Sequence, residues 1–409
     1  ILRMGIGFIL VDPASSKPIL VSGAPLAMTD PTKVPLLLTP GPLTTSETTK
    51  RAMLRDWGSR DGRFVEMNAR IRARLVELAN GGDRFVTIPI QGSGTFAVEA
   101  MLGTMLPKNG RILLAINGAY GHRMARIVEM LGRSAVEYET AEDTPIDAAE
   151  VGRRLDADPA ITHVAVVYCE TTSGVLNPVA AIAEAVARRG RRLLIDAMSA
   201  FGALPLDVSA VACDAVAASS NKCLEGVPGM GFVIARREAI AACEGNAHAL
   251  SLDLHDQWRF MERAGQWRFT PPTHVIAAFD QALTEHAAEG GVEGRGGRYR
   301  ENCRILVEGM RAMGFETLLP DALQAPIIVT FHMPADPNFV FQTFYDRLRD
   351  QGFVIYPGKL TVADSFRVGC IGRLMPSDMH DALAAIAATL AGMGVTNCGP
   401  VPMARRAVG

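Results

Sequence analysis

Residues 192–222 read RLLIDAMSAFGALPLDVSAVACDAVAASSNK, and this stretch decides the fold. It holds two short apolar runs, 193–195 and 215–218, in which hydrophobic residues occupy consecutive positions. Such runs predict strands that are covered on both faces, as in a parallel sheet. Each run is followed by a polar side chain that can do chemistry, Asp196 after the first and Lys222 after the second.

The same kind of run recurs on both sides of this stretch and alternates with segments of helical spacing. Apolar residues from Phe64 to Leu78 step by three and four positions, which predicts a helix. The predicted strands are 84–90, 111–117, 163–170, 192–197, 215–219 and 231–235. Helices that alternate with buried strands predict a doubly wound α/β domain with a mainly parallel sheet over residues 36–275. In such a sheet, ligands bind outside the carboxyl ends of the strands.

The rest of the chain predicts smaller units. A helical segment from residue 276 onward is followed by a glycine-rich stretch at 290–297, which we interpret as a turn. Further strands are predicted at 327–331, 353–356 and 365–370. These elements predict a smaller α+β C-terminal domain over residues 276–395, followed by a tail over 396–409. Residues 1–35 contain several prolines and are expected to form a loose N-terminal extension.

Composition excludes several classes of protein. The 409 residues carry 41 Lys and Arg against 43 Asp and Glu, so no basic field favours nucleic acid as a partner. No apolar run approaches the roughly 20 residues that a membrane-spanning helix needs, so we expect no membrane partner. The seven cysteines are scattered without a C-x-x-C pair, which indicates neither a disulfide framework nor a metal site. A reducing cytoplasm is therefore the expected location.

Three short motifs at predicted strand ends carry the chemistry. Gln91–Thr95 (QGSGT) follows a strand and opens a helix, so its backbone N–H groups can bind a phosphate. Asp196 and Lys222 follow two other strands. Each signal has an ordinary alternative: a plain turn, a helix cap and a surface lysine. Together they suit pyridoxal phosphate, with a phosphate cradle, an acid for the ring nitrogen and a lysine for the aldehyde.

These motifs resemble those of a known enzyme family. The stretches GSGT at 92–95, DAMS at 196–199 and SSNK at 219–222 resemble the class V aminotransferases, a branch of the fold type I pyridoxal-phosphate enzymes. Further similar stretches run from about residue 36 to residue 375, among them TPGPLTTS at 39–46 and WRFTPPTH at 267–274. The resemblance implies an enzyme of fold type I with a large sheet domain and a smaller C-terminal domain.

The resemblance also implies roles for individual residues. Lys222 is expected to hold the cofactor covalently and to move the substrate's proton, and Asp196 to pair with the ring nitrogen. Tyr120 is expected to stack on the ring, and Thr270 to reach the cofactor of a partner subunit in a homodimer with shared active sites. Arg367 is expected to bind the substrate's anionic group. The expected cofactor-binding residues are Ser93, Gly94, Thr95, Tyr120, Thr171, Asp196, Met198, Asn221, Lys222 and Thr270.

The expected substrates are small molecules, an aminophosphonate and a 2-oxo acid. The resemblance implies transfer of the amino group of 2-aminoethylphosphonate to pyruvate, in phosphonate degradation, giving phosphonoacetaldehyde and L-alanine. An alanine–glyoxylate or serine–pyruvate aminotransferase is the alternative. A phosphonate calls for a second contact besides Arg367, and the sequence does not identify it. The candidates are Thr44, Thr45, Ser46, Arg60 and Arg63.

Overall fold

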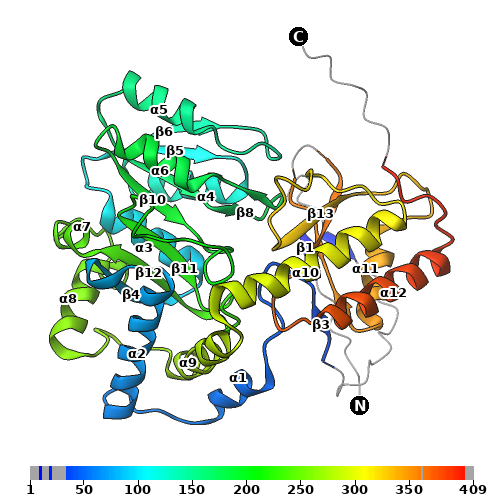
Figure 1. Ribbon diagram of the computed structural model, residues 1–409, viewed down its shortest axis with the longest axis horizontal. Coiled ribbons are helices and arrows are strands. Elements are labelled where there is room, and N and C mark those ends of the chain that lie inside the picture. Colours follow the sequence, from blue (N-terminus) through cyan, green and yellow to red (C-terminus); the bar gives the residue numbers. More distant parts are fainter. Residues whose placement is uncertain (1–8, 12–17, 21–33, 361–362, 401–409) are drawn as a thin grey trace. The chain divides into compact units, whose positions relative to one another are not determined.

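The computed structural model (Figure 1) describes residues 9–11, 18–20, 34–360 and 363–400. The chain divides into two compact units, residues 1–35 and residues 36–409. In the first unit, β1 (Ile9–Val11) pairs antiparallel with β2 (Pro18–Leu20). The predicted extension over 1–35 lies largely outside the described residues, as does the predicted tail from residue 401 on, so both stay predictions.

A seven-stranded sheet forms the centre of the second unit, in the order β4-β12-β11-β10-β7-β5-β6. β12 runs antiparallel to both of its neighbours, and every other neighbouring pair is parallel. The expected α/β class with a mainly parallel sheet is therefore confirmed. The strands are β4 (Phe85–Gly92), β5 (Arg111–Ile116), β6 (Ser134–Glu139), β7 (Ile161–Val167), β10 (Arg192–Asp196), β11 (Ala215–Ser219) and β12 (Gly229–Arg236).

Helices cover both faces of this sheet (Figure 1). Leu193 and Ile195 of β10 pack in one apolar cluster, whereas Leu194 between them packs in a second cluster on the opposite face. All three side chains are buried, which is why the run is apolar at consecutive positions. The covering helices are α2 (Gly62–Leu78), α3 (Gly94–Met105), α4 (Ala119–Met130), α5 (Ala148–Ala157), α6 (Val179–Ala187), α7 (Arg237–Ala241), α8 (Leu254–Ala264) and α9 (Thr273–Ala288).

The edge strand β6 was not predicted from the sequence. Its residues, SAVEYE, include three that are polar and exposed, and only Tyr138 is buried. A strand at the edge of a sheet is partly open to water and keeps charged residues, so it lacks the apolar run that marks the central strands. The remaining short elements are β3 (Leu36–Leu37), α1 (Glu47–Arg51), η1 (Ala52–Leu54), η2 (Gly82–Arg84), β8 (Cys169–Glu170), β9 (Val175–Leu176) and η3 (Leu250–Leu252).

The C-terminal part carries a smaller, three-stranded antiparallel sheet in the order β13-β16-β15. Its core is a separate apolar cluster that includes Phe315, Phe331 and Phe366. The predicted division between residues 275 and 276 falls inside α9 and stays a prediction. The elements are α10 (Gly291–Ala312), β13 (Ile328–His332), α11 (Phe341–Asp350), β14 (Phe353–Val354), β15 (Tyr356–Pro357), β16 (Ser365–Gly369) and α12 (Pro376–Met393).

The turn predicted for the glycine-rich stretch at 290–297 is confined to its first residue, Gly290, and the prediction is wrong for the rest. α10 begins at Gly291 and continues through all the later glycines of the stretch. A Cβ on Gly296 would lie 2.3 Å from the carbonyl oxygen of Ala203, so the helix can approach the large sheet domain only without a side chain there. Tertiary packing outweighs the poor helix propensity of glycine at this point.

Within the parts of the chain that the structure describes, no helix has both the length and the apolar character needed to cross a membrane.

Candidate active site

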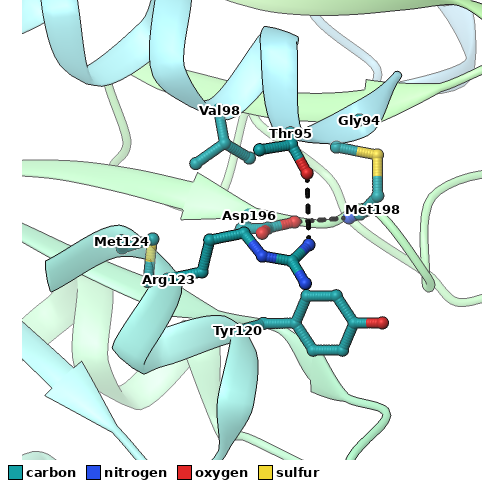
Figure 2. A pocket seen from close by; sticks show the side chains of 8 residues that line it. All are labelled: Gly94, Thr95, Val98, Tyr120, Arg123, Met124, Asp196 and Met198. Atoms are coloured by element: carbon teal, nitrogen blue, oxygen red, sulfur yellow. Dashed lines mark hydrogen bonds between the residues drawn. The ribbon is translucent and has the colours of Figure 1, made fainter. Parts of the chain in front are cut away.

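The strand ends bring the predicted site residues to one edge of the large sheet. Asp196 is the last residue of β10, Lys222 follows β11, and Thr171 follows β8. Gly94 begins α3 directly after β4, and Tyr120 lies in the first turn of α4 after β5. Figure 2 shows the pocket that forms among them. Its lining consists of Gly94, Thr95, Val98, Tyr120, Arg123, Met124, Asp196 and Met198.

Asp196 lies at the floor of this pocket with only 4% of its surface exposed. Its Oδ1 accepts a hydrogen bond of 2.9 Å from the backbone N–H of Met198. Burial raises the pKa of Asp196 to about 6, and this effect outweighs the backbone hydrogen bond and the nearby positive charges of Arg123 and Lys222. A buried carboxyl group with a raised pKa is suited to pair with a cationic group that enters the pocket.

The Lys222 amine is oriented by the loop that precedes α1. Its Nζ donates a hydrogen bond of 2.6 Å to the carbonyl oxygen of Pro40. Gly41 has a φ of +111°, and a Cβ there would lie 2.8 Å from Lys222 Nζ, so only glycine leaves room for the amine. Burial lowers the pKa of Lys222, which raises the fraction of neutral, nucleophilic amine.

The turn from β4 into α3 has features that suit an anion. Ser93 occupies the N-cap position of α3 but its side chain makes no capping hydrogen bond, so the first N–H groups of the helix remain open to a ligand. Gly94 packs closely against Met198, and a Cβ at that glycine would clash with the Met198 sulfur. The hydroxyl oxygens of Thr171 and Ser219 are buried without a hydrogen-bond partner in the described structure.

Arg123 is a pocket residue that the sequence analysis missed. Its Nη1 donates a hydrogen bond of 3.1 Å to Thr95 Oγ1, and its guanidinium carbon lies 4.7 Å from the centre of the Tyr120 ring (Figure 2). Arg123 follows Tyr120 by three positions in α4, so both side chains occupy the same face of the helix. Helical spacing from Tyr120 could therefore have identified it.

Glu170 fixes the start of α4 and the loop that carries Thr171. Its carboxylate accepts hydrogen bonds from the backbone N–H groups of Tyr120 at 3.1 Å and Thr172 at 3.0 Å. Glu170 is fully buried, and burial raises its pKa. It was not predicted, because its role depends on a contact between segments 50 residues apart in the sequence.

Arg367 projects from β16 of the smaller sheet into the same region. Its Nη1 donates a hydrogen bond of 2.7 Å to the Thr171 carbonyl, and its Nε donates one of 3.1 Å to the Pro357 carbonyl. These backbone oxygens, and no carboxylate, are its hydrogen-bond partners in the described part of the chain. Only 2% of its surface is exposed. A buried guanidinium without a carboxylate partner is suited to bind an anionic ligand.

A buried ionic network, composed of Glu225, Arg298 and Tyr299, joins the lysine loop to the segment after β16. Glu225 Oε1 accepts from Arg298 Nη2 at 2.7 Å and from the Tyr299 hydroxyl at 2.6 Å. Arg298 Nη1 donates to the Gly372 carbonyl at 2.6 Å, and Tyr299 accepts from the Gly372 N–H at 3.2 Å. The network therefore connects the loop of Lys222 with the strand of Arg367.

Six predicted residues are not among those that line this pocket, and they are Ser93, Thr171, Asn221, Lys222, Thr270 and Arg367. Thr270 is exposed in the segment between α8 and α9, and Asn221 lies partly buried next to Lys222. The segment of Thr270 is held by a hydrogen bond of 2.7 Å from Trp267 Nε1 to Asn68 Oδ1. Thr270 is thus presented at the surface, which is the placement that contact with a second subunit requires.

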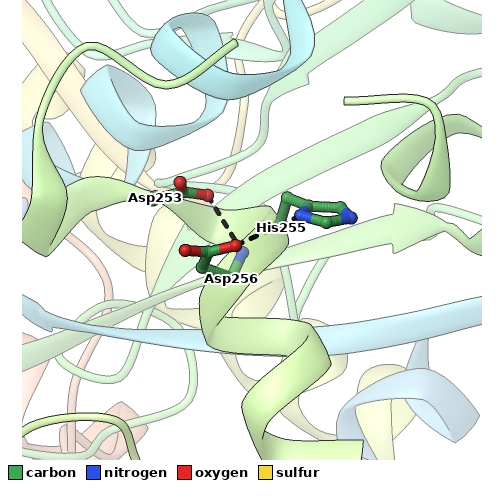
Figure 3. Close-up of side chains that lie close together, drawn as sticks. All are labelled: Asp253, His255 and Asp256. Carbon is green, nitrogen blue, oxygen red and sulfur yellow. Dashed lines mark hydrogen bonds and ion pairs between the residues drawn. The ribbon is translucent and has the colours of Figure 1, made fainter. Parts of the chain in front are cut away.

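Asp253, His255 and Asp256 lie close together at the start of α8 (Figure 3). Their carboxylates already have structural partners. Asp253 Oδ1 caps the helix by accepting from the Asp256 N–H at 3.0 Å, and Asp256 forms an ion pair of 3.2 Å with Arg268. These contacts account for the cluster as a helix start that anchors the neighbouring segment.

Comparison with known proteins relates this site to one family. The family model for class V aminotransferases matches residues 46–355. The 2-aminoethylphosphonate–pyruvate transaminase of Pseudomonas fluorescens (strain Pf0-1) is 54% identical over 364 residues, which cover 89% of this chain and 99% of that protein. The enzyme of the same name from Rhizobium meliloti (strain 1021) is 54% identical over 371 residues, covering 90% of this chain and 97% of that one.

Solved structures share the fold at lower sequence identity. Ureidoglycine–glyoxylate aminotransferase from Bacillus subtilis superposes with a TM-score of 0.82 at 24% identity and covers 89% of this chain and 94% of its own. Pyridoxamine–pyruvate aminotransferase from Mesorhizobium loti gives a TM-score of 0.80, also at 24% identity, and covers 88% of this chain and 93% of its own. The expected fold class is confirmed by these likenesses as well.

Proposed function

The chain belongs to the class V aminotransferase family, and on that premise we propose that it transfers the amino group of 2-aminoethylphosphonate to pyruvate. The products are phosphonoacetaldehyde and L-alanine, in a step of phosphonate degradation. The observation that carries this proposal is the buried Arg367 guanidinium, which has no carboxylate partner in the described residues and lies beside Thr171 at the edge that holds Lys222. An amine and a receptor for an anion at one site fit a substrate with an anionic group near its amino group.

The relatives favour this donor over the alternatives. Two relatives that are 54% identical over nearly their whole length are 2-aminoethylphosphonate–pyruvate transaminases. An alanine–glyoxylate aminotransferase from Nostoc sp. shares the fold with a TM-score of 0.82 but only 21% of its residues. That likeness concerns the fold alone, so we do not propose alanine–glyoxylate or serine–pyruvate transfer.

The pocket fits pyridoxal phosphate as the cofactor. The open N-terminus of α3 with the Ser93 and Thr95 hydroxyls suits the phosphate, and Asp196 suits the ring nitrogen. The hydroxyl of Thr171 is buried without a hydrogen-bond partner in the described structure, which supports a contact with the ring hydroxyl. Tyr120 and Met198 supply apolar contacts for the ring, and Asn221 lies next to the lysine. When bound, the cofactor supplies an aldehyde that receives the amino group and a ring that withdraws electrons from it.

The chain's own residues provide binding and proton transfer. Lys222 would hold the cofactor through its Nζ, and this bond would break when the substrate's amino group takes its place. The released Nζ amine would then remove the proton from the substrate carbon that bears the nitrogen, and the lowered pKa of Lys222 favours this neutral base form. Asp196 stays ionised when a cationic ring nitrogen is beside it, since an opposite charge counteracts the effect of burial. Arg367 binds the phosphonate in one half-reaction and the carboxylate of pyruvate in the other.

We further propose a homodimer with shared active sites, in which Thr270 reaches the cofactor of the partner subunit. Large apolar side chains are exposed at three positions: Phe96 in the first turn of α3, Leu250 in η3, and Phe269 next to Thr270. Arg268 links two of them, because it hydrogen-bonds the Leu250 carbonyl and lies over the Phe269 ring. Exposed apolar groups of this size favour burial against a second copy of the chain.

Subunit mixing tests the dimer. Thr270→Ala is expected to bind pyridoxal phosphate more weakly, and Lys222→Ala to be inactive. A mixed dimer contains one site with both native residues, so mixing the two variants is expected to restore tight cofactor binding to a fraction of the sites. A cytoplasmic location is also proposed, supported by seven free, buried cysteine thiols.

The proposed reaction is tested by a donor screen with pyruvate as acceptor and alanine as the measured product. 2-Aminoethylphosphonate is expected to give the highest kcat/KM among 2-aminoethylphosphonate, serine and glutamate. Lys222→Ala is expected to abolish turnover, whereas Lys108→Ala, at an exposed lysine between α3 and β5, is expected to leave it unchanged. A preference for serine as donor would refute the proposal.

A further inference from the structure

The smaller sheet brings a second cation to the substrate site. Lys359 lies two residues beyond β15, in the connection between β15 and β16. These strands pair so that Tyr356 stands opposite Arg367, and the Arg367 Nε donates to the carbonyl oxygen of Pro357. Lys359 is therefore carried by the same hairpin as Arg367.

The Lys359 side chain extends from this hairpin to the pocket of the large sheet. Its Nζ lies 5.1 Å from the centre of the Tyr120 ring, within the range of a cation–π contact. The charge of Lys359 also contributes to the lowered pKa of Lys222, although burial is the main cause there. Its ammonium is thus close enough to interact electrostatically with the reacting amine.

Lys359 and Arg367 share the lack of an acidic partner within the described part of the chain. Among the residues that the structure describes, no carboxylate forms an ion pair with Lys359 or with Arg367. Lys359 is exposed to solvent, whereas Arg367 is buried. One carboxylate satisfies the planar fork of a single guanidinium. A phosphonate has a third oxygen and, when fully ionised, a second negative charge, for which an additional cation is required.

The other candidates for this second contact are occupied or exposed elsewhere. Thr44 Oγ1 accepts from the Leu37 N–H at 2.8 Å, and Ser46 caps α1 while donating to Glu285 at 2.9 Å. Arg60 is exposed in the segment before α2, and Arg63 is exposed in the first turn of that helix. Thr45, a neutral hydroxyl, could accommodate an oxygen but not a second charge.

We propose that Lys359 is a specificity-determining residue that, together with Arg367, makes the site prefer a doubly charged phosphonate to a singly charged carboxylate. The inference rests on the proposed function, because it concerns the anionic group of the same donor. In this proposal Arg367 binds the anionic groups of both substrates, whereas Lys359 binds only the phosphonate of the amino donor.

Binding of two unreactive anions tests this division. Ethylphosphonate and propionate lack an amino group, so their inhibition constants report anion binding without chemistry. Lys359→Gln is expected to weaken ethylphosphonate about tenfold or more, since a charged hydrogen bond is lost, and to leave propionate within about twofold. The KM for 2-aminoethylphosphonate should rise in parallel, while the KM for pyruvate and the absorbance of the bound cofactor stay unchanged.

Two further variants serve as controls. Lys359→Arg keeps the charge and is expected to retain most of the phosphonate affinity, and Lys108→Gln removes an exposed lysine outside the site and is expected to change neither anion. Equal weakening of both anions by Lys359→Gln, or no weakening of ethylphosphonate, would overturn the inference. The proposed function fails separately, if the wild-type enzyme forms no alanine from 2-aminoethylphosphonate and pyruvate.

Discussion

Replacing Glu225 by glutamine is expected to destabilise the protein far more than the loss of an ordinary ion pair. Glu225 is 3% exposed and lies 2.7 Å from the partly buried Arg298 and 3.4 Å from the buried Arg295. Glutamine keeps the size of the side chain but leaves the two guanidinium groups with Glu289 as their remaining acid. Removing one partner of a buried ion pair costs about 3–5 kcal/mol.

Thermal unfolding of the holoenzyme measures this cost. A chain of 409 residues that unfolds cooperatively has an unfolding entropy of about 0.9 kcal/mol/K, so the expected loss corresponds to a Tm about 4–6 °C lower. Glu301→Gln is the matched control. Glu301 pairs with Arg304 on the exposed side of α10, the helix that also carries Arg295 and Arg298. It is expected to lower the Tm by about 1 °C or less. Equal shifts for the two variants would refute the role assigned to the network.

Three further predictions concern single positions. Burial lowers the pKa of His163 to about 4, below its value of about 6.5 in the unfolded chain. Between pH 6.5 and pH 4 the imidazole is therefore protonated in the unfolded chain but not in the folded one. Stability should therefore fall by about 3 kcal/mol as the pH drops from 6.5 to 4, and His163→Gln should flatten this part of a urea-denaturation series. Thr171→Val removes an unpartnered hydroxyl, so the apoenzyme should be as stable as the wild type or more so, while equilibrium dialysis should show weaker binding of pyridoxal phosphate. Gly41→Ala should slow cofactor attachment, followed by absorbance, by at least about tenfold because its Cβ would meet Lys222; Gly132→Ala, also at positive φ but in open space, should leave that rate unchanged.

The central strands could be predicted closely because both of their faces are buried. β11 has the predicted bounds, and β10 differs by one residue. The elements that the sequence analysis missed or misassigned, β6 and α10, lack such an uninterrupted apolar run. β6 is partly open to water and carries charged residues, and α10 keeps its glycines because Gly296 packs against the Ala203 carbonyl. A contact between segments far apart in the sequence leaves no local signal.

The candidate site divides in the same way. Asp196 and Lys222 follow apolar runs, so their arrival at one sheet edge was predictable, and their catalytic roles remain predictions. Arg123 could have been predicted, since it lies one helical turn beyond Tyr120. Lys359 could not have been predicted, because its approach to Tyr120 depends on the pairing of β15 with β16, which no spacing in the sequence encodes.

The lysine that we propose to react follows β11 of the seven-stranded sheet, whereas the two cations that we propose to bind the anion are carried by the three-stranded one. Natural variation can thus retune which acid is accepted by changing one hairpin, without disturbing the amine chemistry. For laboratory evolution, a library confined to residues 356–360 is the economical place to search for new amino donors.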